Sequence, residues 1–174
     1  MFFLKSFTKD VTITPSDLNK DLKKIIRVKL IEQVTGMCNE KYGYFIKVIK
    51  IGDIKNGYIM DGSGDIIFKM TYEVVLLRPF KNEVCDGVIE KILPNDGGIH
   101  VRVGPMLVFI SSEDIPNNYK LDEKNNCYTN EKDDNDSLKE GEKVRFRYKE
   151  IQFDISEFKP IGTMNDNFLG HILE

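Results

Sequence analysis

The chain has 174 residues, of which 41% are hydrophobic and 30% charged, and its formal net charge is -3. These values are typical of a folded protein with one domain or two small ones, and they exclude a disordered or collagen-like chain. The negative balance excludes general electrostatic attraction to nucleic acid, so any such binding has to come from local basic patches.

Cysteine usage and hydropathy limit the cellular setting. The three cysteines, Cys38, Cys85 and Cys127, form no CxxC pair, which argues against disulfides and against a zinc site. No apolar run approaches the ~20 residues of a membrane span, and residues 1–5 lack the features of a signal peptide. We therefore expect a protein of the cytosol or nucleus that binds no metal and no membrane.

The first half of the chain reads as strands around one helix. Residues 2–7 and 11–13 resemble two short strands, and Pro15 then introduces a helix that Ser16 or Asn19 is placed to cap. Apolar residues follow at three- and four-residue spacing until Gly36, which is the pattern of an amphipathic helix. These apolar residues are Leu18, Leu22, Ile25, Ile26, Leu30 and Val34.

Three further strands are predicted over residues 44–51, 57–60 and 66–77, with a turn at 61–65. The turn, Asp-Gly-Ser-Gly-Asp, lacks both the GxxxxGK[ST] pattern of a phosphate-binding loop and a following helix, so we interpret it as a hairpin tip. The half is therefore α+β, with one main helix packed on an antiparallel sheet.

A domain boundary is predicted after the apolar run of residues 74–77. Pro79 cannot donate a backbone hydrogen bond to a sheet, so the first sheet is expected to end at Arg78. This gives an N-terminal domain of residues 1–78 and a C-terminal domain of residues 79–174. Gly87, inside the next strand, is typical of a sharp bend in a small barrel.

The second half is predicted to be all-β. Strands over residues 83–92, 99–103, 106–111, 142–151 and 158–164 have the spacing of an OB-type barrel. Residues 117–141 form a polar, acidic insertion, which we interpret as a solvated, disordered loop rather than a cation site because EF-hand spacing is absent. The apolar tail of residues 168–173 is expected to pack against something.

OB barrels bind nucleic acid by stacking bases on aromatic side chains in a basic groove. The candidates for stacking are His100 and Phe109, and those for phosphate binding are Arg102, Arg145, Arg147 and Lys149. Each of these residues has an alternative structural interpretation: Phe109 as core, and the basic strand face as simply solvated. Together they favour RNA binding slightly.

Several segments, in their order and spacing, make the chain resemble a known family from end to end. They are residues 1–3 (Met-Phe-Phe), 41–44 (Lys-Tyr-Gly-Tyr), 77–81 (Leu-Arg-Pro-Phe-Lys), 103–106 (Val-Gly-Pro-Met), 109–111 (Phe-Ile-Ser), 115–116 (Ile-Pro), 160–164 (Pro-Ile-Gly-Thr-Met) and 166–170 (Asp-Asn-Phe-Leu-Gly). The family is that of the RNA polymerase stalk subunits, which includes the seventh subunit of eukaryotic RNA polymerase II and its archaeal counterpart.

The resemblance implies a fold and a set of partners. It implies an N-terminal ribonucleoprotein-like tip domain and a C-terminal RNA-binding OB domain of the ribosomal-protein S-one type. It further implies a nuclear, non-catalytic subunit without cofactors, which forms the stalk of RNA polymerase II with the fourth subunit. The tip domain would dock on the core near the clamp, and the barrel would contact single-stranded nascent RNA. The docking residues implied are Tyr42, Gly43, Gly62, Ser63 and Gly64.

Where this family carries aromatic residues for stacking, the chain has Gly97 and His100, and Phe109 stands where a histidine is common. We therefore expect weak, sequence-tolerant RNA contact, aided by the high local concentration of transcript at a polymerase. The alternatives are a stalk subunit of RNA polymerase III or I and a free-standing OB-fold RNA-binding protein. An enzyme is disfavoured because no nucleophile-base motif or metal-ligand spacing is present.

Overall fold

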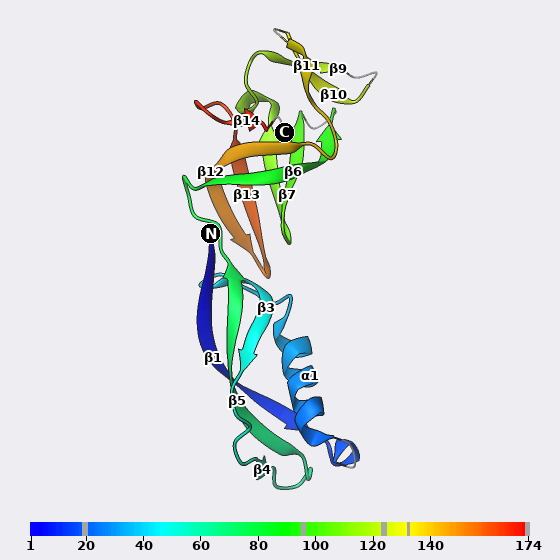
Figure 1. The fold of residues 1–174 in the computed structure, drawn as a ribbon, viewed down its shortest axis with the longest axis vertical. Helices are drawn as coiled ribbons and strands as arrows, with labels where there is room; N and C mark the ends of the chain where they lie inside the picture. The colour runs from blue at the N-terminus through cyan, green and yellow to red at the C-terminus, as the bar shows by residue number, and fades with distance from the viewer. Residues whose placement is uncertain (19–20, 95–96, 123–124, 132, 173–174) are drawn as a thin grey trace. The chain divides into compact units, whose positions relative to one another are not determined.

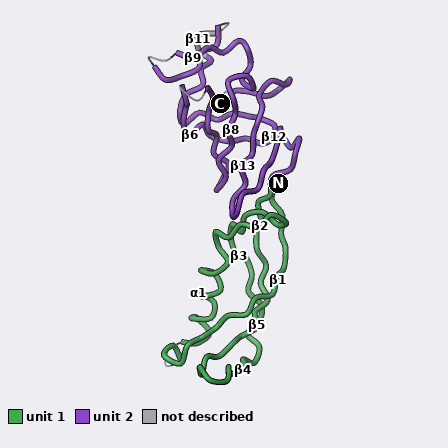
Figure 2. The backbone as a smooth tube through the Cα atoms, turned by 180° about the vertical axis from the view of Figure 1, so that it is seen from behind, with its two compact units in different colours: residues 1–78 green, residues 79–174 purple. Residues whose placement is uncertain are grey.

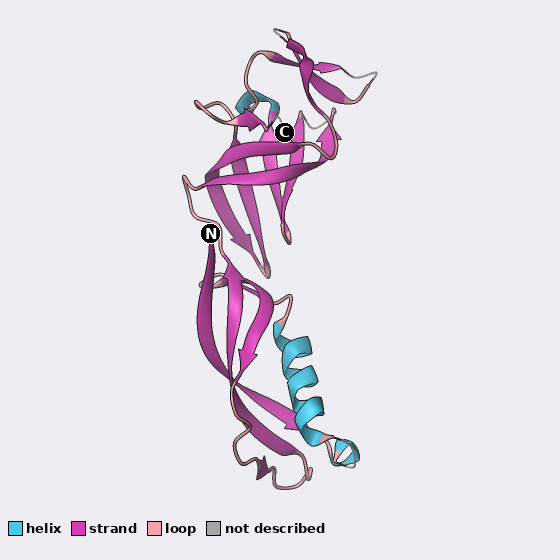
Figure 3. Ribbon diagram, in the orientation of Figure 1, coloured by secondary structure: helices cyan, strands magenta, loops and turns pink. Residues whose placement is uncertain are grey.

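The computed structural model describes residues 1–18, 21–94, 97–122, 125–131 and 133–172. The chain divides into two compact units, Met1–Arg78 and Pro79–Glu174 (Figure 2). The first unit combines one α-helix with a sheet, and the second consists almost entirely of strands (Figure 3). The fold class expected from the sequence, α+β followed by all-β, is therefore confirmed.

The first unit is built on the long hairpin-like pairing of its first and last strands. Strand β1 (Phe2–Ile13) pairs antiparallel with β5 (Ile66–Leu77) along its whole length. Strand β3 (Gly43–Ile51) pairs with the other edge of β5, and the short β2 (Cys38–Asn39) pairs with the outer edge of β3. The two-residue strand β4 (Tyr58–Ile59) pairs with the start of β5.

Helix α1 (Leu22–Val34) lies alongside this sheet (Figure 1). Its apolar stripe points to the core, where Ile26, Leu30 and Val34 are completely buried. Burial of each such side chain stabilises the fold by roughly 1.5–3 kcal/mol. The helix therefore covers one face of the sheet. The sheet residues buried with it include Val11, Ile13, Phe45, Phe68, Met70, Tyr72, Val74 and Leu76.

Two expectations for this unit were wrong in detail. Residues 2–13 form one strand rather than two, because the twelve-residue pairing with β5 continues through the polar Thr8 and Asp10, whose side chains remain exposed. The helix is not capped by Ser16, which lies in a separate 3-10 turn (Pro15–Asp17). Its N-cap is Asp21, whose Oδ1 accepts a 3.4 Å hydrogen bond from the Lys24 amide. The other cap candidate, Asn19, lies outside the described residues.

The second unit contains a closed barrel. Strands β6 (Val84–Leu93), β7 (Gly98–Val103) and β8 (Met106–Ser111) form an antiparallel meander. Strand β12 (Lys143–Asp154) pairs with β6 on one edge and with β13 (Glu157–Thr163) on the other, and β13 returns to β8. The order β13-β8-β7-β6-β12 thus closes on itself through the β12–β13 pairing, as expected for an OB-type barrel.

Gly87 pairs with Val144 of β12 and directly precedes Val88, the residue at which β6 pairs with both β12 and β7. A Cβ atom at this position would lie 2.5 Å from Val101 Cγ1 and 2.9 Å from Val103 Cγ2. Glycine is therefore required here because two core valines of β7 occupy the space of a side chain.

The acidic insertion is not a disordered loop where the structure describes it. Strands β9 (Tyr119–Asp122), β10 (Cys127–Asn130) and β11 (Asp133–Leu138) form a small antiparallel sheet. Its fold depends on a few apolar residues between the charges, because Cys127, Tyr128 and Leu138 are buried. The high average charge of the segment concealed this small core.

The apolar segments expected to need a partner have different environments. In the run of residues 74–77, Val74, Leu76 and Leu77 are already buried, so this run offers little surface to another protein. In the tail, Gly170 and His171 form the short strand β14 (Gly170–His171) on β12, but the neighbouring Phe168 is 96% exposed.

Cys38, Cys85 and Cys127 are not joined by disulfides. Within the described part of the chain, no helix is both long enough and apolar enough to cross a membrane.

Candidate nucleic-acid interface and docking surface

The two predicted stacking residues lie together on the outside of the barrel. His100 of β7 stands opposite Phe109 of β8 in the strand register. Their ring centroids are 5.8 Å apart and their planes meet at 76°. Both side chains are partly exposed, whereas their neighbours Ile99 and Val101 on β7 point into the core. The pair therefore offers an aromatic surface to solvent, although the sequence alone left Phe109 as a possible core residue.

Arg102 follows His100 on the same face of β7. Its Nη2 donates a 2.5 Å hydrogen bond to Glu90 Oε1 on β6. This hydrogen bond lowers the pKa of Glu90 and raises that of Arg102. Because both side chains remain about half exposed, the ion pair is solvent-screened and open to competition from another anion.

A second ion pair holds Lys149 near the end of β8. Its Nζ is 3.1 Å from both carboxylate oxygens of Asp114, a largely buried residue in the 3-10 turn (Ser112–Asp114) that follows β8. The Ser111 hydroxyl donates a further hydrogen bond to Asp114. Lys149 is thus held at the turn that follows the strand carrying Phe109.

The remaining two basic candidates form a different group. The guanidinium of Arg145 makes a bidentate contact with Asp86 of β6, with Nε to Oδ1 at 2.6 Å and Nη2 to Oδ2 at 2.8 Å. These hydrogen bonds lower the pKa of Asp86. Arg147 forms an ion pair with Asp166 in the tail. The structure therefore gives Arg145 and Arg147 each a carboxylate partner.

The predicted core-docking residues do not form one surface. Gly62, Ser63 and Gly64 make the turn between β4 and β5, where both glycines have positive φ. Gly43 begins β3 and lies beside Leu77, at the opposite end of β5. A strand of twelve residues spans roughly 38 Å, so the two groups cannot contact one small patch.

The Tyr42 side chain contacts two residues of β1. Its ring packs edge-on against Phe7 with centroids 5.0 Å apart, and the Lys5 ammonium lies 4.2 Å from the ring centroid. Such aromatic and cation–π contacts stabilise the local fold. Tyr42 therefore packs against β1.

The loop that the resemblance implies for docking, residues 59–65, begins with exposed apolar side chains that were missed as contact residues, and Tyr58 directly precedes it. Tyr58, Ile59 and Met60 are 57%, 67% and 44% exposed. Three consecutive apolar side chains in solvent are unusual on an isolated protein and mark an interaction surface. The signal was present as Tyr-Ile-Met directly before a glycine-rich turn. We call residues 58–64 the tip hairpin.

A buried histidine, also missed, joins the insertion to the tail. His171 Nδ1 lies 2.8 Å from Asp136 Oδ1 of β11, and Nε2 lies 3.2 Å from Glu142 Oε2. Asp136 also accepts hydrogen bonds from the Tyr119 hydroxyl at 2.5 Å and from Asn130 Nδ2 at 2.7 Å. Burial alone would raise the pKa of Asp136, but these three hydrogen-bond partners outweigh it and lower the pKa.

Replacing this histidine is expected to loosen the insertion without unfolding the barrel. In His171→Ala, Asp136 and Glu142 lose a shared partner, and amide hydrogen exchange in β9–β11 should accelerate by about tenfold or more. Exchange in β6–β8 should remain unchanged, as measured by mass spectrometry. The control is His100→Ala, which removes the other, more exposed histidine. Equal protection of β9–β11 in both variants would contradict a joining role for His171.

Metal-binding arrangements are not found in the part of the chain that the structure describes. Among those residues, no group of three or more histidine, cysteine, aspartate or glutamate side chains is arranged to hold a metal ion.

Known proteins are similar to this chain across both of its units. Residues 8–64 match a family model described as the SHS2 domain found in the N terminus of Rpb7p/Rpc25p/MJ0397. The chain is 32% identical over 171 residues to DNA-directed RNA polymerase II subunit rpb7 of Schizosaccharomyces pombe, covering 97% of this chain and 98% of the relative. It is 29% identical to the RPB7 subunit of Saccharomyces cerevisiae, covering 99% and 100%, and 28% identical to rpb7 of Dictyostelium discoideum, covering 99% of both. The chain therefore belongs to the Rpb7 family of DNA-directed RNA polymerase subunits.

Proposed function

We propose that this chain is the non-catalytic stalk subunit of a nuclear RNA polymerase II, and that it forms the stalk with the fourth subunit. The observation that carries the proposal is the near-complete coverage of relatives that are named RNA polymerase II subunits. Because the match extends over nearly the full length of both proteins, both units have counterparts in those relatives. The role of the whole subunit can therefore be proposed for this chain.

In this proposal the tip hairpin docks on the polymerase core near the clamp. The support is its exposed apolar surface at Tyr58, Ile59 and Met60, next to the small residues Gly62, Ser63 and Gly64. Small residues allow a partner backbone to approach closely, and the apolar side chains supply binding free energy. Tyr42 and Gly43, at the other end of β5, are left out of this docking surface.

The barrel would contact nascent RNA through the surface formed by His100, Phe109, Arg102 and Lys149. A base can stack on the exposed aromatic pair while the two cations approach phosphates. Because Glu90 and Asp114 already pair with those cations, RNA has to compete with a carboxylate at each. Weak, sequence-tolerant binding is the expected consequence.

A second candidate function is the equivalent subunit of another nuclear polymerase. The chain is 25% identical over 158 residues to DNA-directed RNA polymerase V subunit 7 of Arabidopsis thaliana, covering 88% of this chain. The higher identity and fuller coverage of the polymerase II relatives favour the first assignment over this one and over polymerase III or I. A free-standing RNA-binding protein is disfavoured by the exposed tip hairpin.

The deciding experiment is purification of the tagged chain from its own cells, with identification of the large subunits that accompany it. The proposal expects the largest subunits of RNA polymerase II and one small partner in equal amounts. Large subunits of polymerase III or I alone would replace it with the alternative assignment. Purification as a single polypeptide bound to RNA would support the free-standing protein instead.

Removing the carboxylate that competes with RNA at Arg102 should strengthen binding. In Glu90→Gln, affinity for a single-stranded oligonucleotide is expected to rise about threefold at low salt. The slope of log K against log salt concentration should become more negative by about 0.7. Fluorescence anisotropy at several salt concentrations measures both quantities. The control Asp10→Asn removes one negative charge from the first unit and should leave the affinity nearly unchanged. Equal gains in both variants would mean that net charge, rather than Arg102, controls binding.

A further inference from the structure

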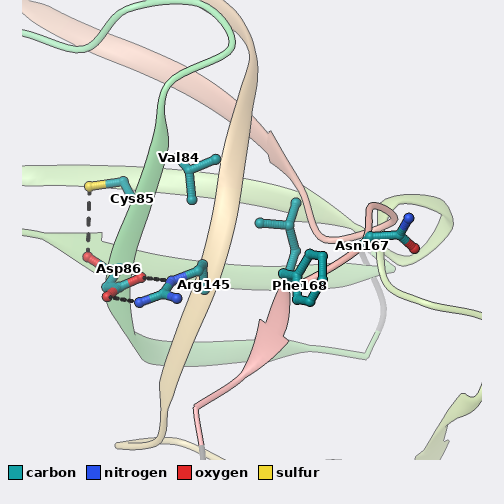
Figure 4. Close-up of a pocket in the computed structure, with 7 residues that line it drawn as sticks. Val84, Cys85, Asp86, Arg145, Asn167 and Phe168 are labelled. Atoms are coloured by element: carbon teal, nitrogen blue, oxygen red, sulfur yellow. Dashed lines mark hydrogen bonds and ion pairs between the residues drawn. The ribbon is translucent and has the colours of Figure 1, made fainter.

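The second unit has an open pocket between β6, β12 and the turn that precedes β14 (Figure 4). Its volume is about 510 Å³. The lining residues are Val84, Cys85, Asp86, Arg145, Asn167, Phe168 and Leu169. None of the proposed RNA-contacting residues His100, Arg102, Phe109 and Lys149 lines it, so the pocket is a separate site.

The position of Phe168 at this pocket is unusual. Its side chain is 96% exposed, and its backbone adopts a φ of +66°. A bulky residue rarely occupies this left-handed conformation, which costs free energy. An exposed phenylalanine ring adds a second unfavourable feature, since burial of that ring would be favourable. What gives these features a role at Phe168 is its place in the lining of the pocket, where a partner could cover the ring.

The turn that carries Phe168 is fixed at both ends. Before it, Asp166 pairs with Arg147 of β12, and its backbone carbonyl accepts a hydrogen bond from the Leu169 amide. After it, β14 pairs with β12, and the Ile172 amide donates to the Lys143 carbonyl. The ring is thus presented to solvent by an anchored turn, which reduces the conformational entropy lost when a partner binds.

The charges around the pocket are already neutralised. Arg145 holds Asp86 through two parallel hydrogen bonds, and Arg147 is paired with Asp166. A phosphate entering here would meet the Asp86 carboxylate, which already holds Arg145, so RNA is a poor occupant. The bidentate pairing uses the polar edge of the Arg145 guanidinium and leaves its flat face for stacking against an apolar or aromatic group.

Apolar surface continues beyond the pocket along the same strand. Val84 and Val88 flank Asp86 on the outward face of β6 and are 51% and 40% exposed. Together with Phe168 and Leu169 they surround a neutral ion pair. An uncharged occupant with apolar side chains matches this surface better than a charged one.

We propose that this pocket is a docking site for a polypeptide that inserts an aromatic or long aliphatic side chain from an uncharged segment between Phe168 and the Arg145–Asp86 pair. The proposal deepens the proposed function, because the polypeptide is sought among the components of the polymerase complex. It also assigns Arg145 to protein contact, although the sequence had suggested RNA, and leaves Arg147 to anchor the turn through Asp166. Phe168 is the main contact residue of the site, and the ion pairs fix the strands and the turn around it.

The chain offers a matched control for the test. Ile155, in the turn between β12 and β13, is 95% exposed and has a φ of +51°, yet it does not line the pocket. Asparagine tolerates the left-handed conformation, so Phe168→Asn and Ile155→Asn should both fold normally. Only the first removes the proposed main contact residue.

The experiment places the photocrosslinking residue p-benzoylphenylalanine at position 168 or 155 of the full-length chain in its own cells. Position 168 is expected to yield one crosslinked polypeptide, identified by mass spectrometry, which position 155 does not yield. In a binding assay with that polypeptide, Phe168→Asn should weaken the affinity about 10- to 100-fold and Ile155→Asn should leave it unchanged.

The outcomes separate this inference from the proposed function. Crosslinks only to RNA, no crosslink, or the same pattern from both positions would overturn the docking site, even where the chain still co-purifies with polymerase. A specific crosslinked polypeptide whose affinity depends on Phe168 would support the site. If that polypeptide is not a polymerase component, the docking site stands, and the proposed function is decided by the co-purification experiment alone.

Discussion

Gly43→Ala is expected to destabilise the first unit by about 3 kcal/mol or more. Gly43 has a φ of +85°, which is unfavourable for alanine, and it begins β3 directly beside the end of β5. An added Cβ would clash with the Leu77 carbonyl oxygen and lie 2.8 Å from Arg78 Cβ. Because the obstacle is backbone, the strands themselves would have to separate. Hydrogen exchange of β3 and β5 amides in the full chain measures the loss.

Gly36→Ala separates the two causes of that effect. Gly36 has a nearly identical φ of +83°, but no atom lies within 4 Å of the position its Cβ would take. Alanine there meets only the conformational penalty, so a loss of about 1 kcal/mol is expected. If both variants lost the same stability, the close approach of Gly43 to Leu77 would not matter. Barrel amides provide an internal reference, because they belong to the other unit.

The sequence predicted strands correctly where the alternation of apolar and charged residues matches the alternation of buried and exposed side chains. The alternation of Val144, Phe146 and Tyr148 with charged residues predicted β12, and all three are buried as expected. The pattern failed at β1, an edge strand with one open face, where polar residues are tolerated within a continuous strand. It also failed in the acidic insertion, because three buried side chains are too few to show against the surrounding charges.

The candidate sites were less predictable, since they depend on contacts between distant strands. The sequence placed the basic residues of β12 on its outward face, but it contained no register with β6 and hence no indication that Asp86 faces Arg145. The pairing of Arg147 with Asp166 likewise depends on the path of the tail. The glycine turn at 62–64 was recognisable as a tip, whereas its distance from Gly43 follows only from the length of β5.

A charge in the tip hairpin should have the largest effect on function. Ile59→Asp is expected to weaken association with the polymerase core by about 100-fold or more, because an interface that buries Ile59 would have to desolvate a carboxylate. The isolated chain should keep its stability, since Ile59 is 67% exposed and β4 contributes only two residues to the sheet. Co-purification with tagged core subunits, quantified by mass spectrometry, measures the association.

The matched control is Ile155→Asp, which introduces the same charge at a residue that is 95% exposed in the second unit. Core association should be unchanged in this variant, because Ile155 lies outside the tip hairpin. Ser63→Asp places a charge at the glycine turn itself and should weaken association as Ile59→Asp does, because the turn and the apolar segment belong to one docking surface. If Ile59→Asp bound the core normally while Ser63→Asp did not, the backbone of the turn alone would make the contact, and the exposure of residues 58–60 would require another partner.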